Sequence, residues 1–531
     1  MSGTNPVKGT VTGANLVLGA DLTDGTADIW GIDPRTGRRR EPAARSATPD
    51  EVDRAAQAAA DAADDLAGWS RSRRAELLEG IAQRLDGIAE ELVATAAAET
   101  GLIAEPRLVS ELGRTTGQLR FLAEVVEDGA YLEASLDRSD AGVDVRRMLI
   151  PVGPVAVFGA SNFPLAFSVP GGDTAAALAV GCPVVAKAHP AHPHTSELSA
   201  RAISAALADA GAPAGAFGLV HGVDAGRRLV GHPGVAAVSF TGSKAGGLAL
   251  AELARQRPVP IPVFAEMGSL NPVIVTPAAM RTRAQEIADG LLASVSASAG
   301  QLCTKPGVVL IPAQDDVPDL AGLLAASLAS LPAQPLLTSG IAEAWGQWIE
   351  QARQSGAEVV VSPVAVPTEG IWARPVVVAV DAQRFMDDAH LREECFGPLT
   401  VLVRYRDQAE LEKTAGALGG SLTGTVQAGS DDDPDAHRAA ELLGARVGRL
   451  IWNGWPTGVA VTWSMQHGGP YPATLDATHT SVGAAALRRF LRPVSYQGVP
   501  AAALPPELRD DLGHAGGGAV RREEGILRVR R

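Results

Sequence analysis

The chain has 531 residues, 46% of them apolar, and carries 46 Lys and Arg against 60 Asp and Glu, a formal net charge of −14. This length allows two or three domains around a large core, and the charge argues against nucleic acid or an anionic membrane as a partner. The three cysteines, Cys182, Cys303 and Cys395, are far apart and lack metal-ligand spacing, so we expect neither a disulfide framework nor a zinc site, and a reducing cytoplasm fits best. No signal-like apolar segment opens the chain, and no run approaches ~20 uninterrupted apolar residues, so neither export nor a membrane anchor is expected.

Short strands and turns are expected over residues 11–44, followed by three helices that serve as scaffold. The first helix begins at Thr48-Pro49-Asp50-Glu51, where Thr48 is the N-cap and Pro49 the first helical residue, and runs to about Leu66. Apolar spacing predicts a second helix from Ser72 to Glu99 and a third from Glu105 to Gly129. The third contains Gly113-Arg114-Thr115-Thr116-Gly117-Gln118-Leu119-Arg120, whose two arginines indicate either a solvated face or a functional one.

From Pro154 onward, short apolar runs alternate with helical segments, which predicts a parallel sheet covered on both faces. The expected strands are Val155–Phe158, Val184–Lys187, Phe217–Val220, Ala237–Phe240 and Ile261–Ala265. A nucleotide would lie at the loops that follow such strands. The Gly-x-Gly-x-x-Gly fingerprint is absent from these loops, which argues for a variant of the usual dinucleotide-binding fold.

Residues 266–470 repeat this alternation and are expected to form a second domain, with strands at Val308–Ile311, Val359–Val361, Val376–Val380 and Thr400–Val403. The first domain comprises residues 1–130 and 152–265. The strand-like segments 131–151 and 484–500 lie outside both patterns, so we expect them to pair into a small sheet that reaches a neighbouring subunit. The tail, 501–531, is glycine-rich and is expected to be less ordered.

The chemistry is placed at Gly300-Gln301-Leu302-Cys303-Thr304, after a helix predicted from Arg283 to Ala299 that Gly300 would end. An isolated cysteine is commonly a small buried apolar residue. Here the cysteine lies on a loop attached to a helix, which suits a nucleophile.

The cysteine motif occurs with four others in one order along residues 20–500. They are Gly159-Ala160-Ser161-Asn162-Phe163-Pro164, Phe240-Thr241-Gly242-Ser243, Phe264-Ala265-Glu266-Met267-Gly268 and Glu393-Glu394-Cys395-Phe396-Gly397-Pro398. This set resembles the motifs of the aldehyde dehydrogenase superfamily. The resemblance implies an α/β fold with two doubly wound parallel-sheet domains and a small strand-based oligomerisation element, assembled as a homodimer or homotetramer.

The resemblance assigns Cys303 as the nucleophile that adds to an aldehyde and later carries a thioester. The Asn162 side-chain amide and the Cys303 backbone N–H would bind the oxyanion. Glu266, beside an apolar run that would raise its pKa, would activate the water that cleaves the thioester. Relatives that transfer the acyl group to coenzyme A or phosphate typically lack this glutamate, so its presence favours hydrolysis.

For the cofactor, the resemblance places Lys187 at the adenosine ribose, Gly242 and Ser243 at the pyrophosphate, Glu394 at the nicotinamide ribose and Phe396 beside it. NAD-preferring relatives commonly have glutamate where this chain has Pro190, so a 2′-phosphate becomes admissible, and NADP is favoured while NAD stays open. The loop histidines His189, His192 and His194 lack a nearby cysteine or carboxylate pair, and no metal is predicted.

Within the superfamily, the segment with Arg114, the segment around Asn162 and the sequences Asn453-Gly454-Trp455-Pro456 and His467-Gly468-Gly469-Pro470 resemble α-ketoglutaric semialdehyde (2,5-dioxovalerate) dehydrogenases. Such a substrate ends in a carboxylate, for which Arg114 is the expected partner. Phe163 would line the pocket, and residues from about Trp455 to Val461 would form the facing wall. The alternatives are a dehydrogenase of neutral medium or long-chain aldehydes and an inactive binding protein on the same fold.

Overall fold

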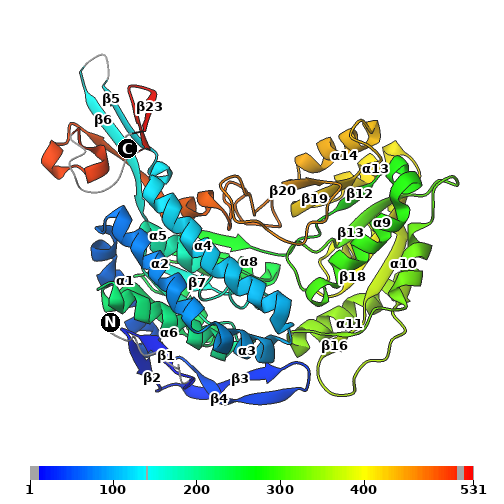
Figure 1. Cartoon of the computed structure of the whole chain (residues 1–531), viewed down its shortest axis with the longest axis horizontal. Helices are drawn as coiled ribbons and strands as arrows, with labels where there is room; N and C mark the ends of the chain where they lie inside the picture. Colours follow the sequence, from blue (N-terminus) through cyan, green and yellow to red (C-terminus); the bar gives the residue numbers. More distant parts are fainter. Residues whose placement is uncertain (1–10, 139–141, 511–519, 530–531) are drawn as a thin grey trace.

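The computed structural model describes residues 11–138, 142–510 and 520–529. Two α/β lobes lie side by side, and a small sheet projects from the first lobe (Figure 1). No helix among the described residues is long and apolar enough to cross a membrane.

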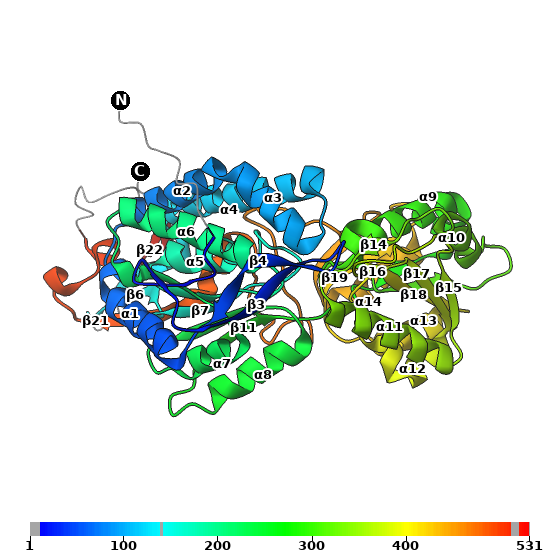
Figure 2. The same cartoon turned by 90° about the horizontal axis from the view of Figure 1, so that it is seen from below.

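The N-terminal segment forms two hairpins, in agreement with the expected strands: β1 (Asn15–Val17) with β2 (Ala20–Leu22), and β3 (Thr26–Asp33) with β4 (Arg38–Ser46). The second hairpin runs along the first lobe to the second (Figure 2). At its tip the backbone N–H of Ile371 donates to the Pro34 carbonyl at 2.7 Å. This hairpin therefore links the two lobes.

The predicted first helix is confirmed as α1 (Pro49–Ala67), and Thr48 and Glu51 form the expected capping box. The single second helix predicted over Ser72–Glu99 is wrong, because the chain breaks at Ile88 into α2 (Arg71–Gly87) and α3 (Ala89–Thr100). A π-turn over Ala104–Leu108 then precedes α4 (Val109–Asp128), which ends at Gly129 with φ +78°. All four helices belong to the first lobe (Figure 1).

The first sheet is 7-stranded, in the order β11-β10-β7-β8-β9-β1-β2. Its parallel strands are β7 (Val155–Phe158), β8 (Val184–Lys187), β9 (Phe217–Val220), β10 (Ala237–Thr241) and β11 (Val263–Glu266), close to the predicted ranges. The connecting helices are α5 (Gly172–Val180), α6 (Pro193–Asp209), α7 (Val223–Gly231) and α8 (Lys244–Arg255). Lys187 and Glu266 thus end two strands at one edge of the sheet.

The second sheet is also 7-stranded, in the order β15-β17-β18-β13-β12-β19-β20. The predicted strands are β13 (Val308–Pro312), β15 (Glu358–Val361), β17 (Val376–Asp381) and β18 (Leu399–Tyr405), and the sequence analysis missed β12 (Val273–Val275), β19 (Ser421–Gln427) and β20 (Val447–Trp452). Only β15 runs antiparallel within this sheet. Along β13, side chains alternate between two buried clusters, so helices cover both faces.

The helices of the second lobe are α9 (Pro277–Ser296), α10 (Leu320–Leu328), α11 (Ser339–Gln354), α12 (Ala382–Asp387), α13 (Gln408–Gly416) and α14 (Pro434–Gly444). A short pair, β14 (Gln334–Pro335) and β16 (Trp372–Ala373), completes the lobe. Helix α9 begins six residues before Arg283, the predicted start. Arg283 itself has a non-helical φ of −135° within the helix.

The projecting sheet is 5-stranded, in the order β21-β6-β5-β22-β23. It confirms the pairing of the two outlying segments, since β6 (Asp144–Pro151) pairs with both β5 (Ala134–Arg138) and β21 (Leu491–Gln497). Residues 484–490 form a 3-10 turn. The expectation of a less ordered tail is wrong for β22 (Val520–Glu523) and β23 (Ile526–Val529), which extend this sheet, while Gly516–Gly518 lie outside the described residues.

Candidate active site

Cys303 lies on a tight turn between α9 and β13, at the junction of the lobes. The predicted helix to Ala299 is too long, because α9 ends at Ser296 and Ser298 and Ala299 adopt φ values of 50° and 57°. Gly300 continues at φ +66°, and a Cβ there would lie 2.2 Å from the Gly397 carbonyl oxygen. Left-handed residues of this kind persist only where surrounding contacts fix them.

Three buried polar side chains supply those contacts. Gln301 accepts the Leu337 N–H at 2.9 Å, and Asn271 Nδ2 donates to the carbonyls of Cys303 and Lys305, each at 2.8 Å. Lys305 Nζ in turn donates to the carbonyls of Cys395 and Leu399 at 3.0 and 2.7 Å. The backbone around the sulfur is therefore fixed before any ligand binds.

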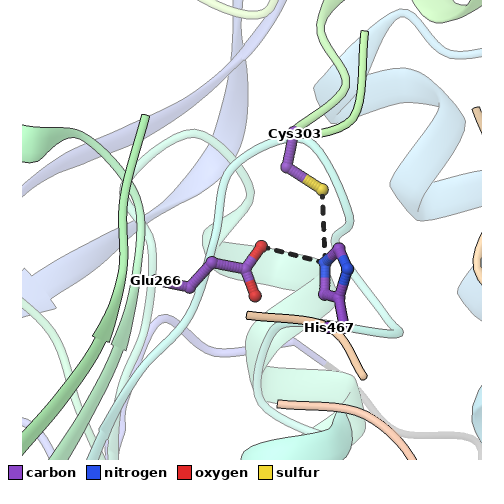
Figure 3. Close-up of side chains that lie close together, drawn as sticks. All are labelled: Glu266, Cys303 and His467. Atoms are coloured by element: carbon purple, nitrogen blue, oxygen red, sulfur yellow. Dashed lines mark hydrogen bonds and ion pairs between the residues drawn. The ribbon is translucent and has the colours of Figure 1, made fainter. Parts of the chain in front are cut away.

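The Cys303 thiol points to His467, which also contacts Glu266 (Figure 3). The distance from Sγ to His467 Nε2 is 3.6 Å, and the same nitrogen lies 3.1 Å from Glu266 Oε1. Glu266 Oε2 accepts a hydrogen bond from Ser481 Oγ at 2.6 Å. One imidazole nitrogen thus faces two acceptors, a carboxylate and a sulfur, as it would when it carries a proton; the tautomer is inferred from this geometry.

The electrostatics of this cluster differ from the sequence-based expectation. Burial acts to raise the pKa of Glu266, but the charge of His467 and the hydrogen bonds from His467, Ser481 and Cys303 outweigh it, so the pKa lies below its usual value. The expectation of a raised pKa was wrong because burial, although the largest single influence, is exceeded by the combined effect of His467, Ser481 and Cys303. Burial, followed by the charges of Glu266 and Glu394, instead raises the pKa of Cys303 well above its usual value.

His467 is the site residue that the sequence analysis did not assign. Its segment was noted only for its resemblance to one subfamily, with no role. The residue is 164 positions from Cys303, and its ring is buried. Only the fold brings it to the thiol. The sequence His467-Gly468-Gly469-Pro470 was the one feature that could have indicated a role for it.

Asn162 contacts the turn that carries Cys303. It is buried on the loop after β7, and its Nδ2 donates to the Gln301 carbonyl at 2.9 Å. Arg107 fixes the loop by donating to the Asn162 carbonyl at 3.2 Å. One amide hydrogen of Asn162 is thus used, and the second is available to a ligand.

Arg114 and Phe163 both pack against Phe167. Arg114 Nε donates to the Val459 carbonyl at 3.3 Å, and its guanidinium carbon lies 4.8 Å from the Phe167 ring centre. Both terminal nitrogens, Nη1 and Nη2, are buried and have no hydrogen-bond partner among the described residues. Phe163 packs edge-on against Phe167 at 5.2 Å.

The structure does not bring Trp455 to this group. Trp455 packs on α9, where a Cβ on Gly290 would come within 2.1 Å of its indole nitrogen, and it joins the buried cluster of the second lobe. Val459 and Val461, further along the same segment, contact the cluster of Phe163 and Phe167 instead. Of the segment predicted to face Arg114, Val459 and Val461 therefore lie at that wall, and Trp455 packs elsewhere.

The expected cofactor residues lie at the carboxyl edge of the first sheet. Lys187 ends β8, and burial lowers its pKa to about 8. Ser243 caps α8, accepting the Gly246 N–H at 3.2 Å, and it and Gly242 are exposed. A helix N-terminus at an exposed loop suits a pyrophosphate.

A cavity of about 540 Å³ opens at the same edge, beyond β8 and β9. It is lined by Pro190, by the start of α7 and by the N-terminal segment, including Asp24, Asp28 and Asp224. Its position outside the strand ends is where nucleotides bind on such sheets.

Glu394 and Phe396 lie in the segment that precedes β18. Gly268 leaves room for the carboxylate, since a Cβ at that position would lie 2.4 Å from Glu394 Oε2. Burial raises the pKa of Glu394 to about 7, against the charge of Lys305. Phe396 is partly exposed two residues further on.

The three loop histidines do not converge on a common point. His192 Nε2 lies 2.9 Å from the Ala160 carbonyl oxygen, and His194 Nε2 lies 2.7 Å from that of Pro42. Each ring is thus used to fix a loop. His189 stacks on His192 with 5.5 Å between ring centres.

Comparison with known proteins identifies the family. The profile of the aldehyde dehydrogenase family matches residues 24–491. "Alpha-ketoglutaric semialdehyde dehydrogenase 2" of Azospirillum brasilense is 44% identical over 506 residues, 93% of this chain and 96% of that protein. The alpha-ketoglutaric semialdehyde dehydrogenase of Acinetobacter baylyi is 43% identical over 475 residues, 87% of this chain and 89% of that protein.

A solved structure extends the comparison to the fold. The crystal structure of betaine aldehyde dehydrogenase from Staphylococcus aureus in complex with NAD⁺ matches with a TM-score of 0.80 at 20% identity, covering 92% of this chain and 97% of that one. The predicted α/β fold is thereby confirmed. The chain belongs to the aldehyde dehydrogenase family, as its motifs predicted.

Proposed function

We propose that the protein oxidises an aldehyde to a carboxylate through a thioester on Cys303, with a nicotinamide dinucleotide as hydride acceptor. The observation that carries this proposal is the contact of the partly buried Cys303 thiol with His467, and of His467 with Glu266, at 3.6 and 3.1 Å. The group combines a nucleophile, a hydrogen-bond donor and a base at one point.

The first step needs a thiolate, and the raised pKa of Cys303 means that the resting thiol keeps its proton. Glu266 has a lowered pKa and accepts a hydrogen bond from the thiol, so it is an ionised acceptor for this proton. His467 Nε2–H then donates to the sulfur anion. The thiolate adds to the aldehyde carbon, and the oxyanion that forms lies within reach of Asn162 and the Cys303 N–H.

The second step follows hydride departure, which leaves an acyl group on the Cys303 sulfur. The nicotinamide, when bound, accepts that hydride. Glu266, after returning its first proton to solvent, takes a proton from the water that attacks the thioester carbon. Cys303 leaves as a thiolate and the carboxylate product is released. The presence of Glu266 beside the sulfur favours water over coenzyme A or phosphate as the acyl acceptor.

The substrate that we propose is α-ketoglutaric semialdehyde, which would give α-ketoglutarate. Both curated relatives described above carry that substrate in their names. In this chain the supporting feature is Arg114, whose two unpartnered nitrogens are set for the two oxygens of a carboxylate. A neutral long-chain aldehyde would leave this buried guanidinium unpaired, so that alternative is disfavoured.

The test compares kcat/KM for α-ketoglutaric semialdehyde, succinic semialdehyde and hexanal in the parent and in Arg114→Ala. Loss of a charge-assisted pair costs about 2 to 3 kcal/mol, or some 30- to 150-fold, and should appear for the two acidic substrates only. Arg120→Ala is a matched control, because Arg120 is on the same helix and pairs with Asp86 on the surface. A parent that prefers hexanal, or equal losses on all three substrates, would reject the assignment.

The cofactor preference depends on the cavity beside Pro190. The sequence favoured NADP because Pro190 removes a carboxylate from this position. Three other carboxylates, Asp24, Asp28 and Asp224, line the cavity, and no Lys or Arg is among its described lining residues. A 2′-phosphate there would be repelled, so we infer that NAD binds more tightly than NADP. A lower Kd for NADP than for NAD in fluorescence titrations would reverse this inference.

We also propose a homo-oligomer, a dimer or a pair of dimers, built on the projecting sheet. Strand β21 forms one edge of that sheet and is largely exposed, so its unpaired backbone groups suit a two-fold contact with a second copy. A monomeric mass in sedimentation at micromolar concentration would contradict this. The three cysteines are free, which supports a reducing, cytoplasmic compartment.

A further inference from the structure

The contact between Cys303, His467 and Glu266 supplies one sulfur, one nitrogen and one oxygen donor in a small space. The three donor atoms all lie within 4.8 Å of one another. These are the donor types that Zn²⁺ takes in proteins, at about 2.3 Å for sulfur and about 2.0 Å for nitrogen or oxygen. The cluster therefore has the composition of a zinc site, in a protein whose chemistry needs no metal.

The spacing of the donors also fits. A tetrahedral Zn²⁺ holds a thiolate and an imidazole nitrogen about 3.6 Å apart, and an imidazole nitrogen and a carboxylate oxygen about 3.3 Å apart. The distances in the structure are 3.6 Å from Sγ to Nε2 and 3.1 Å from Nε2 to Oε1. The remaining distance, from the Cys303 sulfur to the Glu266 oxygen, is within 4.8 Å, and rotation of the two side chains would shorten it to the value that the ion needs.

The surroundings support such an ion. Ser481 Oγ holds the second oxygen of Glu266 at 2.6 Å, and Thr480 Oγ1 accepts the backbone N–H of His467 at 2.8 Å. Outer contacts of this kind orient metal ligands. The thiolate and Glu266 together carry two negative charges, which match Zn²⁺. Of the other charged groups close to the thiol, Glu394 favours a cation, and Arg114 opposes it.

We propose that these three side chains bind one Zn²⁺ ion reversibly and that the bound ion inhibits the enzyme. Binding forms Zn–S, Zn–N and Zn–O bonds and releases the thiol proton to solvent, with no change in oxidation state. Coordination occupies the sulfur lone pair that would attack an aldehyde and the carboxylate that would activate water. Sulfur and nitrogen donors select zinc over Mg²⁺ or Ca²⁺.

This inference rests on donor geometry and does not depend on the identity of the aldehyde. The full-length protein, freed of metal and then of chelator, is titrated with ZnCl₂ against a chromophoric zinc indicator. We expect one equivalent bound per chain in the parent. Cys303→Ala, His467→Asn and Glu266→Gln should each lower the affinity by at least about 100-fold, since even outer-shell losses cost 10- to 100-fold.

Two controls separate this site from generic binding. Cys182→Ala removes a buried thiol elsewhere, and His479→Ala removes a histidine paired with Asp476 at 3.3 Å, a His–carboxylate pair without sulfur. Both should bind zinc as the parent does. Circular dichroism and Tm establish that each variant is folded, and His467→Gln serves as a second variant if His467→Asn is not.

A spectroscopic readout tests the ligands directly. Co²⁺ in place of zinc should give a thiolate charge-transfer band in the near ultraviolet that disappears in Cys303→Ala. Zinc should also slow alkylation of Cys303 by iodoacetamide in the parent, and much less in His467→Asn. Equal zinc affinity in the parent and His467→Asn, or a thiolate band that survives Cys303→Ala, would overturn the proposal. Failure of aldehyde oxidation in the metal-free parent would reject the proposed function and leave zinc binding standing.

Discussion

The turn that carries Cys303 and the loops that follow β8 and β10 differ in how fully their polar groups are satisfied. Around Cys303, buried amides of Asn271 and Gln301 and the ammonium of Lys305 bind backbone groups on either side of the sulfur. On the cofactor side, Gly242 and Ser243 are exposed, and a cavity of about 540 Å³ remains open.

This difference follows from what each region must hold. A nucleophile works best when its position is fixed in advance, because ordering it during the reaction would add to the barrier. A dinucleotide must enter and leave in every turnover, so its loops gain from exposed helix N–H groups that a ligand satisfies. The catalytic turn therefore contains strained residues such as Ser298 and Ala299, and the cofactor loops contain none in the left-handed region apart from glycine.

The largest expected effect is a loss of catalysis without a loss of cofactor binding. Cys303→Ala should lower kcat by at least about 10⁴-fold, because no covalent intermediate can form. The Kd for NADH, measured by fluorescence, should change less than about 3-fold, since the thiol does not hold the dinucleotide. Measurable steady turnover in Cys303→Ala would contradict the role of the sulfur.

The next effect separates formation of the thioester from its hydrolysis. If Glu266 serves the hydrolysis step, Glu266→Gln should release roughly one equivalent of reduced cofactor per site in a burst and then turn over slowly. The burst would be slower than in the parent, because Glu266 also accepts the thiol proton. Stopped-flow absorbance measures both phases. Parental steady turnover, or the absence of any first equivalent at long times, would reject the assignment to hydrolysis.

The fold was largely predictable from the sequence where strands are apolar. Runs such as Val155–Phe158 and Val376–Val380 are buried on both faces, so their residues are apolar throughout. Strand β19 was missed because Ser421, Thr423, Thr425 and Gln427 are polar yet buried, and hydropathy alone does not show that burial. The break at Ile88 was missed because an apolar pattern continues across it, although Gly87 at the end of α2 was a signal.

The site was predictable only in part, for a similar reason. Local motifs pointed to Cys303, Glu266 and Asn162, and the structure brings the three together. His467 could not be assigned, because its role depends on a contact between segments 164 residues apart. The position of Trp455 has the same origin: the predicted segment supplies Val459 and Val461 to the wall, but Trp455 itself packs against Gly290 of α9, a contact that the sequence does not show.

A matched pair of substitutions measures how far the two regions differ in rigidity. Asn271→Ala leaves the Cys303 and Lys305 carbonyls without their donor in a buried place, which should cost about 3 kcal/mol of stability and lower kcat roughly 10-fold. Ser243→Ala removes an exposed helix cap, for about 1 kcal/mol, and should raise the Kd for the dinucleotide by a few fold with kcat unchanged. Tm and kinetics report both. Equal losses of Tm in the two variants would remove the proposed contrast.

The smallest effect concerns charge on the cofactor side. Burial lowers the pKa of Lys187 to about 8, so its ammonium is present below that pH and is lost as the pH rises through it. If Lys187 holds the adenosine end, the Kd for the dinucleotide should be lowest below pH 7.5 and rise about 3- to 10-fold towards pH 9.5, because only the charged form donates to the ligand with full strength.

The neighbouring titratable groups do not obscure this dependence. Burial lowers the pKa of His221 to about 4 and that of His189 well below its usual value, so both rings are uncharged across the range. Lys187→Met keeps the length of the side chain without the charge, and its Kd should be high and independent of pH between 7 and 9.5. A flat profile in the parent, or the same slope in Lys187→Met, would show that the open side of the junction recognises the cofactor without this lysine.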